Sequence, residues 1–299
     1  MKNIKFSSIF MLVCTMLLTF SACEEDATNV DLPKYTPRLV VYAFISPSDT
    51  MITVKVSTTR NLFGVQTDYP TSVPIQLTFV DGDKQMYFDA AENSTYTLRY
   101  TLEAGKEYTL KGTCKGYPDI KATCRIPALK APNITIDTTS VLEKFDSPYN
   151  GVGYFLANKV KVNVYDKPNE VNYYNVITRV KFKRNEQDIQ TYSLCVEKKE
   201  INEEPKYNKL FSDNLIDGKS TTIYYSISDF NANPSIQYII VKATVLEVDA
   251  HYYKYHTSLS NYQGGSDPFT EFSPVYSNVE GGYGVFCSYM KYEKEFKIK

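Results

Sequence analysis

The sequence predicts a mainly β protein, in which a β-sandwich is followed by a second β-rich domain that carries one α-helix. The first observation is a series of short segments in which apolar and polar residues alternate, as they do in half-buried strands. The second is the presence of 26 Tyr and no Trp among 299 residues, because Tyr suits the pleated surface of a sheet. The third is a single segment, residues 250–263, with helical spacing. The tyrosines could equally supply a binding face.

Residues 1–22 have the order of a bacterial secretion signal: a basic start, an apolar stretch from Ile9 to Phe20, and then Ser21-Ala22. The stretch is shorter than the ~20 residues that a membrane-spanning helix needs, so we expect it to be removed. Cys23 follows directly and resembles the acylated cysteine of a lipobox, although Phe20 stands where Leu is usual. An ordinary signal peptide with a chance cysteine, or an uncleaved anchor, is the alternative.

Residues 23–37 are predicted to form a lipidated tether without an apolar period. The triplet Glu24-Glu25-Asp26 resembles the export signal of surface lipoproteins, and a plain solvated linker is the alternative. No second apolar run approaches spanning length. We therefore expect the lipid on Cys23 to be the membrane attachment.

Residues 38–127 are predicted to form an immunoglobulin/transthyretin-like β-sandwich, because short alternating strands with turn residues between them are typical of that architecture. The domain is expected to end where Pro127 and Pro132 bracket four residues. The expected strands are 39–45, 52–57, 75–79, 96–102, 108–114 and 120–126.

Cys114 and Cys124 fall on the inward faces of the last two of these strands. A disulfide would form if they lay opposite each other at a non-hydrogen-bonded site, where the Cα atoms are about 4.5 Å apart. A tight loop at 116–119 would spoil that register, and the two residues would then be buried thiols acting as small apolar groups.

Residues 133–299 are predicted to form the second, β-rich domain. Residues 236–248 should be a central strand, because they are apolar on both faces. Residues 183–219 are polar and are expected to form a long excursion of uncertain pairing. The other expected strands are 160–164, 176–182, 220–228 and one that begins at Val285.

One segment of this domain has helical rather than strand spacing. Asp249 is a natural N-cap for it, and Gly264-Gly265 should end it. The stripe is expected to pack on the sheet. Its members follow one another at spacings of three, four and three: Tyr252, Tyr255, Leu259 and Tyr262.

Several function classes are disfavoured by composition and motifs. A formal net charge of −1 gives no electrostatic footprint for nucleic acid. HExxH, GxSxG, P-loop and CxxC patterns do not occur. His251 and His256 are five residues apart, so they do not share a helical face on which to chelate a metal. We therefore expect no catalytic residues, no metal and no cofactor, although a carboxylate pair of the glycosidase kind is left open by the many Asp and Glu residues.

Four stretches carry a family resemblance. They are 211–219, 252–255, 266–269 and, as the most specific, 274–286, which contains Ser277-Asn278-Val279-Glu280-Gly281-Gly282-Tyr283-Gly284. With the lipobox and the 39–45 strand, they resemble the Bacteroidota lipoproteins of the domain-of-unknown-function family numbered 4249. That family has no established activity to transfer.

The resemblance implies a partner and a location. Such lipoproteins are often encoded beside TonB-dependent outer-membrane transporters, so it implies an accessory or ligand-capture role in nutrient uptake at the cell surface, with an unknown ligand. The alternative is a structural or adhesive surface β-sandwich without a transport role.

The most specific motif also supplies a candidate partner loop. Its glycines precede a strand rather than a helix, which disfavours a phosphate cradle, and they indicate positive φ or close backbone approach. A loop that docks on its own domain is the structural alternative. The candidate residues are Asp267, Pro268, Phe269, Asn278, Gly281, Gly282, Tyr283 and Gly284.

Overall fold

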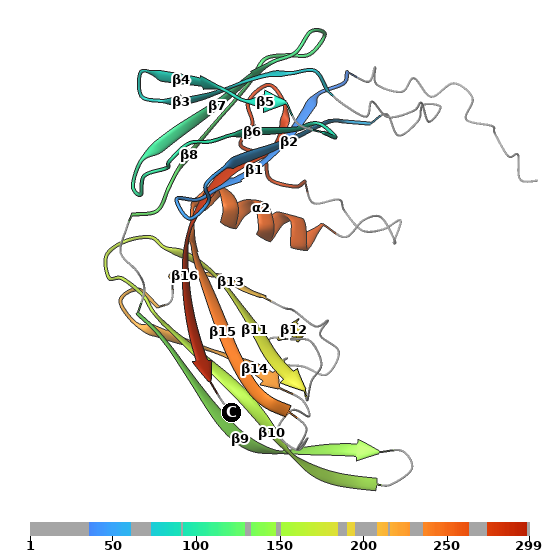
Figure 1. Cartoon of the computed structure of the whole chain (residues 1–299), viewed down its shortest axis with the longest axis vertical. Coiled ribbons are helices and arrows are strands. Elements are labelled where there is room, and N and C mark those ends of the chain that lie inside the picture. The colour runs from blue at the N-terminus through green and yellow to red at the C-terminus, as the bar shows by residue number, and fades with distance from the viewer. Residues whose placement is uncertain are drawn as a thin grey trace, which may run out of the picture. The chain divides into compact units, whose positions relative to one another are not determined.

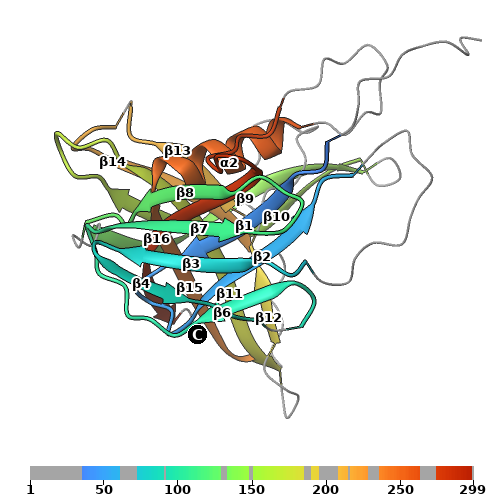
Figure 2. The same cartoon turned by 90° about the horizontal axis from the view of Figure 1, so that it is seen from above.

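The structure is a computed structural model, and residues 37–299 form one compact unit in it. Within the described part of the chain the unit is mainly β with one helix, arranged in three sheets (Figures 1 and 2). This confirms the predicted fold class. The described residues are 36–60, 73–90, 92–128, 133–147, 151–184, 190–194, 208–214, 216–227, 236–262 and 274–297.

The first sandwich packs two sheets face to face. One is part of the nine-stranded sheet and has the strand order β16-β1-β2-β6-β5. The other is the four-stranded sheet, with the order β4-β3-β7-β8. The N-terminal strands are β1 (Leu39–Ile45), β2 (Ile52–Thr58), β3 (Gln76–Asp81), β4 (Lys84–Tyr87), β5 (Asp89–Ala90), β6 (Thr95–Leu98), β7 (Glu107–Thr113) and β8 (Ile120–Arg125).

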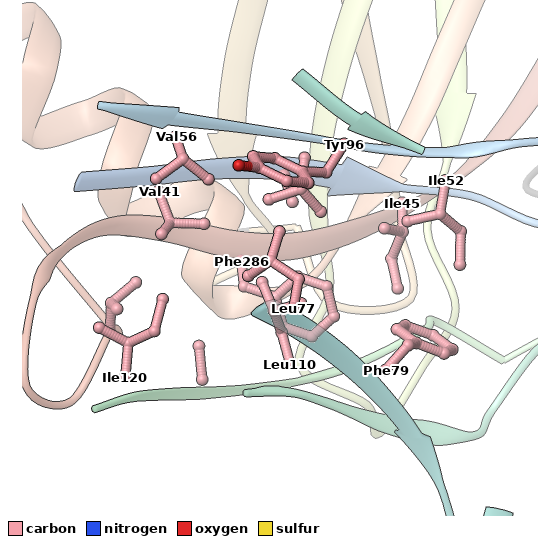
Figure 3. Packing of buried hydrophobic residues seen from close by; sticks show 14 of the residues in the cluster. Val41, Ile45, Ile52, Val56, Leu77, Phe79, Tyr96, Leu110, Ile120 and Phe286 are labelled. Carbon is pink, nitrogen blue, oxygen red and sulfur yellow. The ribbon is translucent and has the colours of Figure 1, made fainter. Parts of the chain in front are cut away.

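The alternation of the sequence becomes the core of this sandwich. In β1 every second residue from Leu39 to Ile45 is buried, and in Figure 3 side chains of both layers point toward one another. Phe79 of β3 stacks on Tyr108 of β7, with ring centroids 5.2 Å apart. Burial of such side chains contributes about 1.5–3 kcal/mol each.

A second sandwich is built from the rest of the chain. The sheet β12-β11-β15-β16 packs against the sheet β14-β10-β9, and the core between them includes Val162, Val176 and Val241. The strands are β9 (Asn133–Ser147), β10 (Gly151–Tyr165), β11 (Tyr173–Arg184), β12 (Gln190–Ser193), β13 (Asn208–Ser212), β14 (Ser220–Ile227), β15 (Ile236–Val248) and β16 (Tyr283–Lys297). As predicted, β15 is central, with β11 on one side and β16 on the other.

Strand β16 takes part in both sandwiches. It pairs in parallel with β1 from Val40↔Tyr283 to Ile45↔Ser288, and antiparallel with β15 from Val248↔Tyr289 onward. Phe286 of β16 lies in the first core. The residues of β16 fall in the predicted domain of residues 133–299, but their side chains pack against both cores.

Helix α2 (Ala250–Asn261) packs on the outer face of β15 and β16. Asp249 is its N-cap, as predicted, and accepts a hydrogen bond from the backbone of Tyr252. Tyr252 and Tyr255 are buried, but Leu259 and Tyr262 of the predicted stripe are exposed. The helix ends at Asn261, and the predicted stop at Gly264-Gly265 lies outside the described residues.

The described helix, α2, is too short to cross a membrane, and no other described segment forms a helix long and apolar enough to do so. The prediction for residues 183–219 left out two short strands, β12 and β13, which both pair with β11.

Candidate functional site

A groove of about 470 Å³ lies where the first sandwich meets the start of α2. It is lined by Gly105 and by three short segments, residues 125–128, 170–173 and 247–250. Two other hollows, of about 610 Å³ beside residues 99–101 and about 240 Å³ beside Gly112, occur in the described part of the chain. Of these three hollows in the described residues, the groove is the one with a buried carboxylate in its lining, that of Glu247. It is therefore the candidate site.

One wall is held by a glycine turn. Gly105 has φ +76°, a conformation that favours glycine, and its N–H donates to the carbonyl of Ile126 at 3.0 Å. The Nε of Arg125 donates in turn to the carbonyl of Gly105 at 3.0 Å. The turn thus fixes the base of the Arg125 guanidinium at the edge of the groove.

The opposite wall is formed by the start of α2. The Oδ1 atom of Asp249 accepts from the N–H of Tyr252 at 2.7 Å, and its Oδ2 accepts from the N–H of Ser288 at 3.0 Å. Burial outweighs these hydrogen bonds and raises the pKa of Asp249 to about 6. The carboxyl group therefore changes its charge near neutral pH.

Ser288 joins the two walls. Its Oγ lies 2.8 Å from the carbonyl oxygen of Arg125 and 3.1 Å from Oδ2 of Asp249. A hydroxyl has one proton, so it donates to one of these oxygens at a time. The end of β8 and the start of α2 are thus connected through a single residue of β16.

Glu247 lies deeper and forms an ion pair with Lys167. The Nζ atom of Lys167 is 2.8 Å from each carboxylate oxygen, and both side chains are largely buried. Burial raises the pKa of Glu247, while the ammonium of Lys167 acts in the opposite direction. The pair is held within the protein and leaves little uncompensated charge toward the groove.

The third segment supplies apolar and aromatic surface. The ring of Tyr173 stacks on that of Tyr253 with centroids 4.6 Å apart, and Val171 is 72% exposed. The lining as a whole contains neither His nor a Ser, Thr or Cys nucleophile. The segment therefore offers contacts for the apolar part of a small molecule.

The chain can now be placed among known proteins. The family model "Domain of unknown function (DUF4249)" matches residues 25–295. The chain belongs to the DUF4249 family. The match covers most of the DUF4249 chain and includes every described strand and helix except the last two residues of β16.

Other comparisons add little to this assignment. No curated protein matches the DUF4249 chain. Among solved structures, a mutant of Salmonella alpha-2-macroglobulin is 12% identical, with a TM-score of 0.25 over 73% of this chain and 14% of that one. Trypsin-activated alpha-2-macroglobulin from Escherichia coli is also 12% identical, with a TM-score of 0.24 over 74% and 15%. The chain thus spans only a small part of the length of these two proteins.

A DUF3823 family protein from Parabacteroides merdae is 11% identical, with a TM-score of 0.17 over 72% of this chain and 92% of that one. All three likenesses are too weak to indicate a shared function.

The predicted partner loop of the DUF4249 chain is docked on its own body where it is described. A Cβ atom on Gly281 would lie 2.0 Å from the carbonyl oxygen of Asp119, and one on Gly284 would lie 1.9 Å from that of Val41. Both glycines therefore permit close backbone approach. Asp267, Pro268 and Phe269 lie outside the described residues.

Asn278 and Tyr283, the other candidate loop residues, differ in their surroundings. The Nδ2 atom of Asn278 donates to the carbonyls of Thr123 and Phe286, and its Oδ1 accepts from the N–H of Phe286. Tyr283 is 54% exposed. Of the described side chains in the predicted loop, that of Tyr283 is the one available to a partner.

The predicted disulfide between Cys114 and Cys124 is not formed. Cys124 lies opposite Tyr108 in the β7–β8 register, and both cysteines are free and buried. Cys114 follows the last residue of β7 and begins a turn, because its carbonyl accepts from the N–H of Tyr117. Burial raises the pKa of both thiols, so they remain protonated and apolar, which is the alternative weighed above.

Three acidic side chains, Asp166, Asp213 and Asp217, have ligand atoms within 4.8 Å of one another. Each already accepts a hydrogen bond from the protein, from Gly218, Asn172 and Asn169 respectively. These contacts join the connection between β10 and β11 to the connection between β13 and β14. The cluster thus has a structural explanation without an ion.

The remaining sequence-predicted site residues lie outside the described part of the DUF4249 chain. They are Cys23, Glu24, Glu25 and Asp26. The groove itself was missed by the sequence prediction because its lining comes from four separate segments. Only Asp249 carried a local signal, as a helix N-cap.

Proposed function

We propose that this DUF4249 chain is an outer-membrane-anchored, surface-exposed lipoprotein that captures a ligand and works with a TonB-dependent transporter in nutrient uptake. The observation that carries the binding role is the groove at residues 125–128, 170–173 and 247–250. Its volume of about 470 Å³ falls within the roughly 300–1,000 Å³ of small-molecule sites. Apolar walls with a few charged groups are the usual lining of such sites.

The order of residues 1–26 supports the location. An apolar stretch too short to span a membrane precedes Cys23, and the family match begins at residue 25, two positions later. Acyl chains on Cys23 would hold the body near the membrane, because residues 23–37 span at most about 50 Å even when fully extended. The groove would then lie within reach of a membrane partner.

The way the groove is built also favours capture over covalent chemistry. Two of its carboxylates are fixed by neighbours: Asp249 by Tyr252 and Ser288, and Glu247 by Lys167. Fixed groups bind without a large ordering cost. A site of this kind takes up a ligand and releases it unchanged, as handing cargo to a transporter requires.

Co-purification tests the transporter role. The tagged protein is expressed at native level in its own host, and the membranes are solubilised in mild detergent. An outer-membrane transporter should be recovered with it in near-stoichiometric amount. The matched control is an unrelated lipoprotein with the same tag and anchor.

Repeated recovery of the protein alone would contradict the transporter role. Recovery of assembled fibres, or adhesion of cells to host matrix that is lost on deletion, would support the structural or adhesive alternative instead.

A further inference from the structure

The one cationic side chain in the groove lining, that of Arg125, has unused hydrogen-bonding capacity. We propose that the groove binds a small organic anion, a carboxylate attached to an apolar body of about the size of an aromatic ring. This inference rests on the proposed ligand-capture function and names the chemical class of the ligand.

Arg125 supplies the hydrogen-bond donors that an anionic ligand would meet in the groove. Its side chain is exposed, and in the described part of the chain it makes one hydrogen bond, from Nε to the carbonyl of Gly105. A guanidinium carries five N–H donors in a planar fork that matches a carboxylate in bidentate geometry. The two terminal nitrogens therefore remain free to bind one, and the bond to Gly105 orients them.

Two of the three carboxylates in the lining, those of Asp249 and Glu247, already have hydrogen-bond partners, and the third, that of Glu170, is exposed. Asp249 accepts from two backbone N–H groups, with Ser288 Oγ also within 3.1 Å of it. Both oxygens of Glu247 are 2.8 Å from Lys167 Nζ. A cationic ligand would have to compete with these partners, whereas an anion finds the free donors of Arg125. The free donors of Arg125, rather than the net charge of the lining, therefore favour an anion.

The apolar part of the ligand is specified by the walls. Pro127 and Ala128 follow Arg125 in the lining, and Val171 and Tyr173 line the groove from another segment. A large part of Val171 is exposed to water, and each Å² of apolar surface removed from water contributes about 25 cal/mol. A flat ring beside Arg125 would cover this surface while its carboxylate meets the guanidinium.

The test uses three probes that share one apolar body: phenylacetate, the neutral phenylacetamide and the cationic phenethylamine. Each is titrated into the ¹⁵N-labelled mature chain from Glu24 onward, which contains the whole compact unit of residues 37–299. Phenylacetate should bind and shift the amide signals of Val171, Tyr173 and Ala250. Phenylacetamide should bind roughly tenfold more weakly, because it lacks the negative charge that strengthens hydrogen bonds from a guanidinium.

Matched variants test whether Arg125 is responsible for the binding of phenylacetate. Arg125→Gln should weaken phenylacetate binding roughly tenfold or more, and Arg125→Lys should lie between it and the parent. Arg99→Gln, which alters an arginine in a different hollow, should change nothing. Thermal melting of each variant shows whether the fold is retained.

Three results would overturn the proposal: tighter binding of phenethylamine than of phenylacetate, equal weakening by Arg125→Gln and Arg99→Gln, or no shifts at the groove with any probe. These outcomes are separate from the fate of the proposed function. Recovery of a transporter with the Arg125→Gln protein would leave the accessory role standing while the ligand class fails.

Discussion

At the residue scale, two features of its surroundings act in opposite directions on the charge of the Asp249 carboxyl group. As an N-cap it stabilises α2 best when it is ionised, since a carboxylate accepts from N–H groups and favours the positive end of the helix dipole. Burial beside Ser288 penalises the same charge and raises the pKa to about 6. The folded protein therefore holds a proton on Asp249 more tightly than the unfolded chain does.

The sign of the pH dependence follows from this raised pKa. Between about pH 4 and pH 6 the folded state keeps the proton and the unfolded state has lost it, so the contribution of Asp249 to stability falls as pH rises. The free energy of unfolding, measured relative to Asp249→Asn by urea denaturation, should fall by up to about 3 kcal/mol from pH 4 to pH 7. A difference between the two proteins that stays constant with pH would contradict this.

Gly284 shows how a single missing side chain permits a strand pairing. Its φ is +108°, and a Cβ atom would lie 1.9 Å from the carbonyl oxygen of Val41. Gly284→Ala should destabilise the protein by more than about 4 kcal/mol. Gly82→Ala is the matched control, because Gly82 also has positive φ but nothing within 4 Å of a Cβ atom, and it should cost only about 1–2 kcal/mol. Comparable melting temperatures for the two variants would refute the close-contact explanation.

At the scale of elements, the segment leading into β16 is held by Asn278. Its amide makes three hydrogen bonds to backbone groups of β8 and β16, so it locks the segment to both strands. This is the role of a structural bracket rather than of a partner contact.

Two substitutions test that role. Asn278→Ala should cost about 2–4 kcal/mol, because backbone groups lose their partners. Asn278→Asp should cost at least as much, since it turns an oxygen toward the carbonyls of Thr123 and Phe286. Tyr283→Ala, at the exposed residue of the same segment, should change the unfolding free energy by under about 1 kcal/mol. Wild-type stability of Asn278→Asp in chemical denaturation would count against the bracket.

Elements with a strong local pattern could be predicted from the sequence. The strands β1, β2, β7 and β8 have strict alternation, and α2 has an N-cap and two buried tyrosines at helical spacing. Leu259 was placed on the buried stripe because spacing alone does not reveal where the underlying sheet ends. The sequence left open whether Cys114 and Cys124 form a disulfide or are buried thiols, because the register depends on how many residues the β7–β8 connection takes up; the structure has the buried thiols.

Contacts between distant segments could not be predicted in the same way. The parallel pairing of β1 with β16 joins residues more than 240 positions apart, and no local pattern specifies it. The groove has the same origin, since Arg125 and Asp249 meet through Ser288 of a third strand. Local propensity describes the elements, whereas the site arises from their long-range packing.

At the scale of the whole molecule, the proposed anchor makes a prediction about location. Cys23→Ala should abolish incorporation of a labelled fatty acid and release the protein from the membrane fraction. Protease added to intact cells should digest the anchored wild-type protein. Replacement of Glu24, Glu25 and Asp26 by Ala should make it resistant until the cells are permeabilised. Protection of the wild-type protein in intact cells would place it on the periplasmic side.

The parallel pairing of β1 with β16 also affects the order in which the strands pair during folding. Arg38, just before β1, hydrogen-bonds to the carbonyl of Gly281, 243 positions later. Closure of so long a loop is entropically costly and slow. In a chain that emerges N-terminus first, β1 cannot complete its pairing until β16 has emerged. Until then, the edge of β1 that β16 will occupy stays open to other chains. The strand nearest the proposed lipid is thus among the first to emerge and among the last to gain its full set of neighbours.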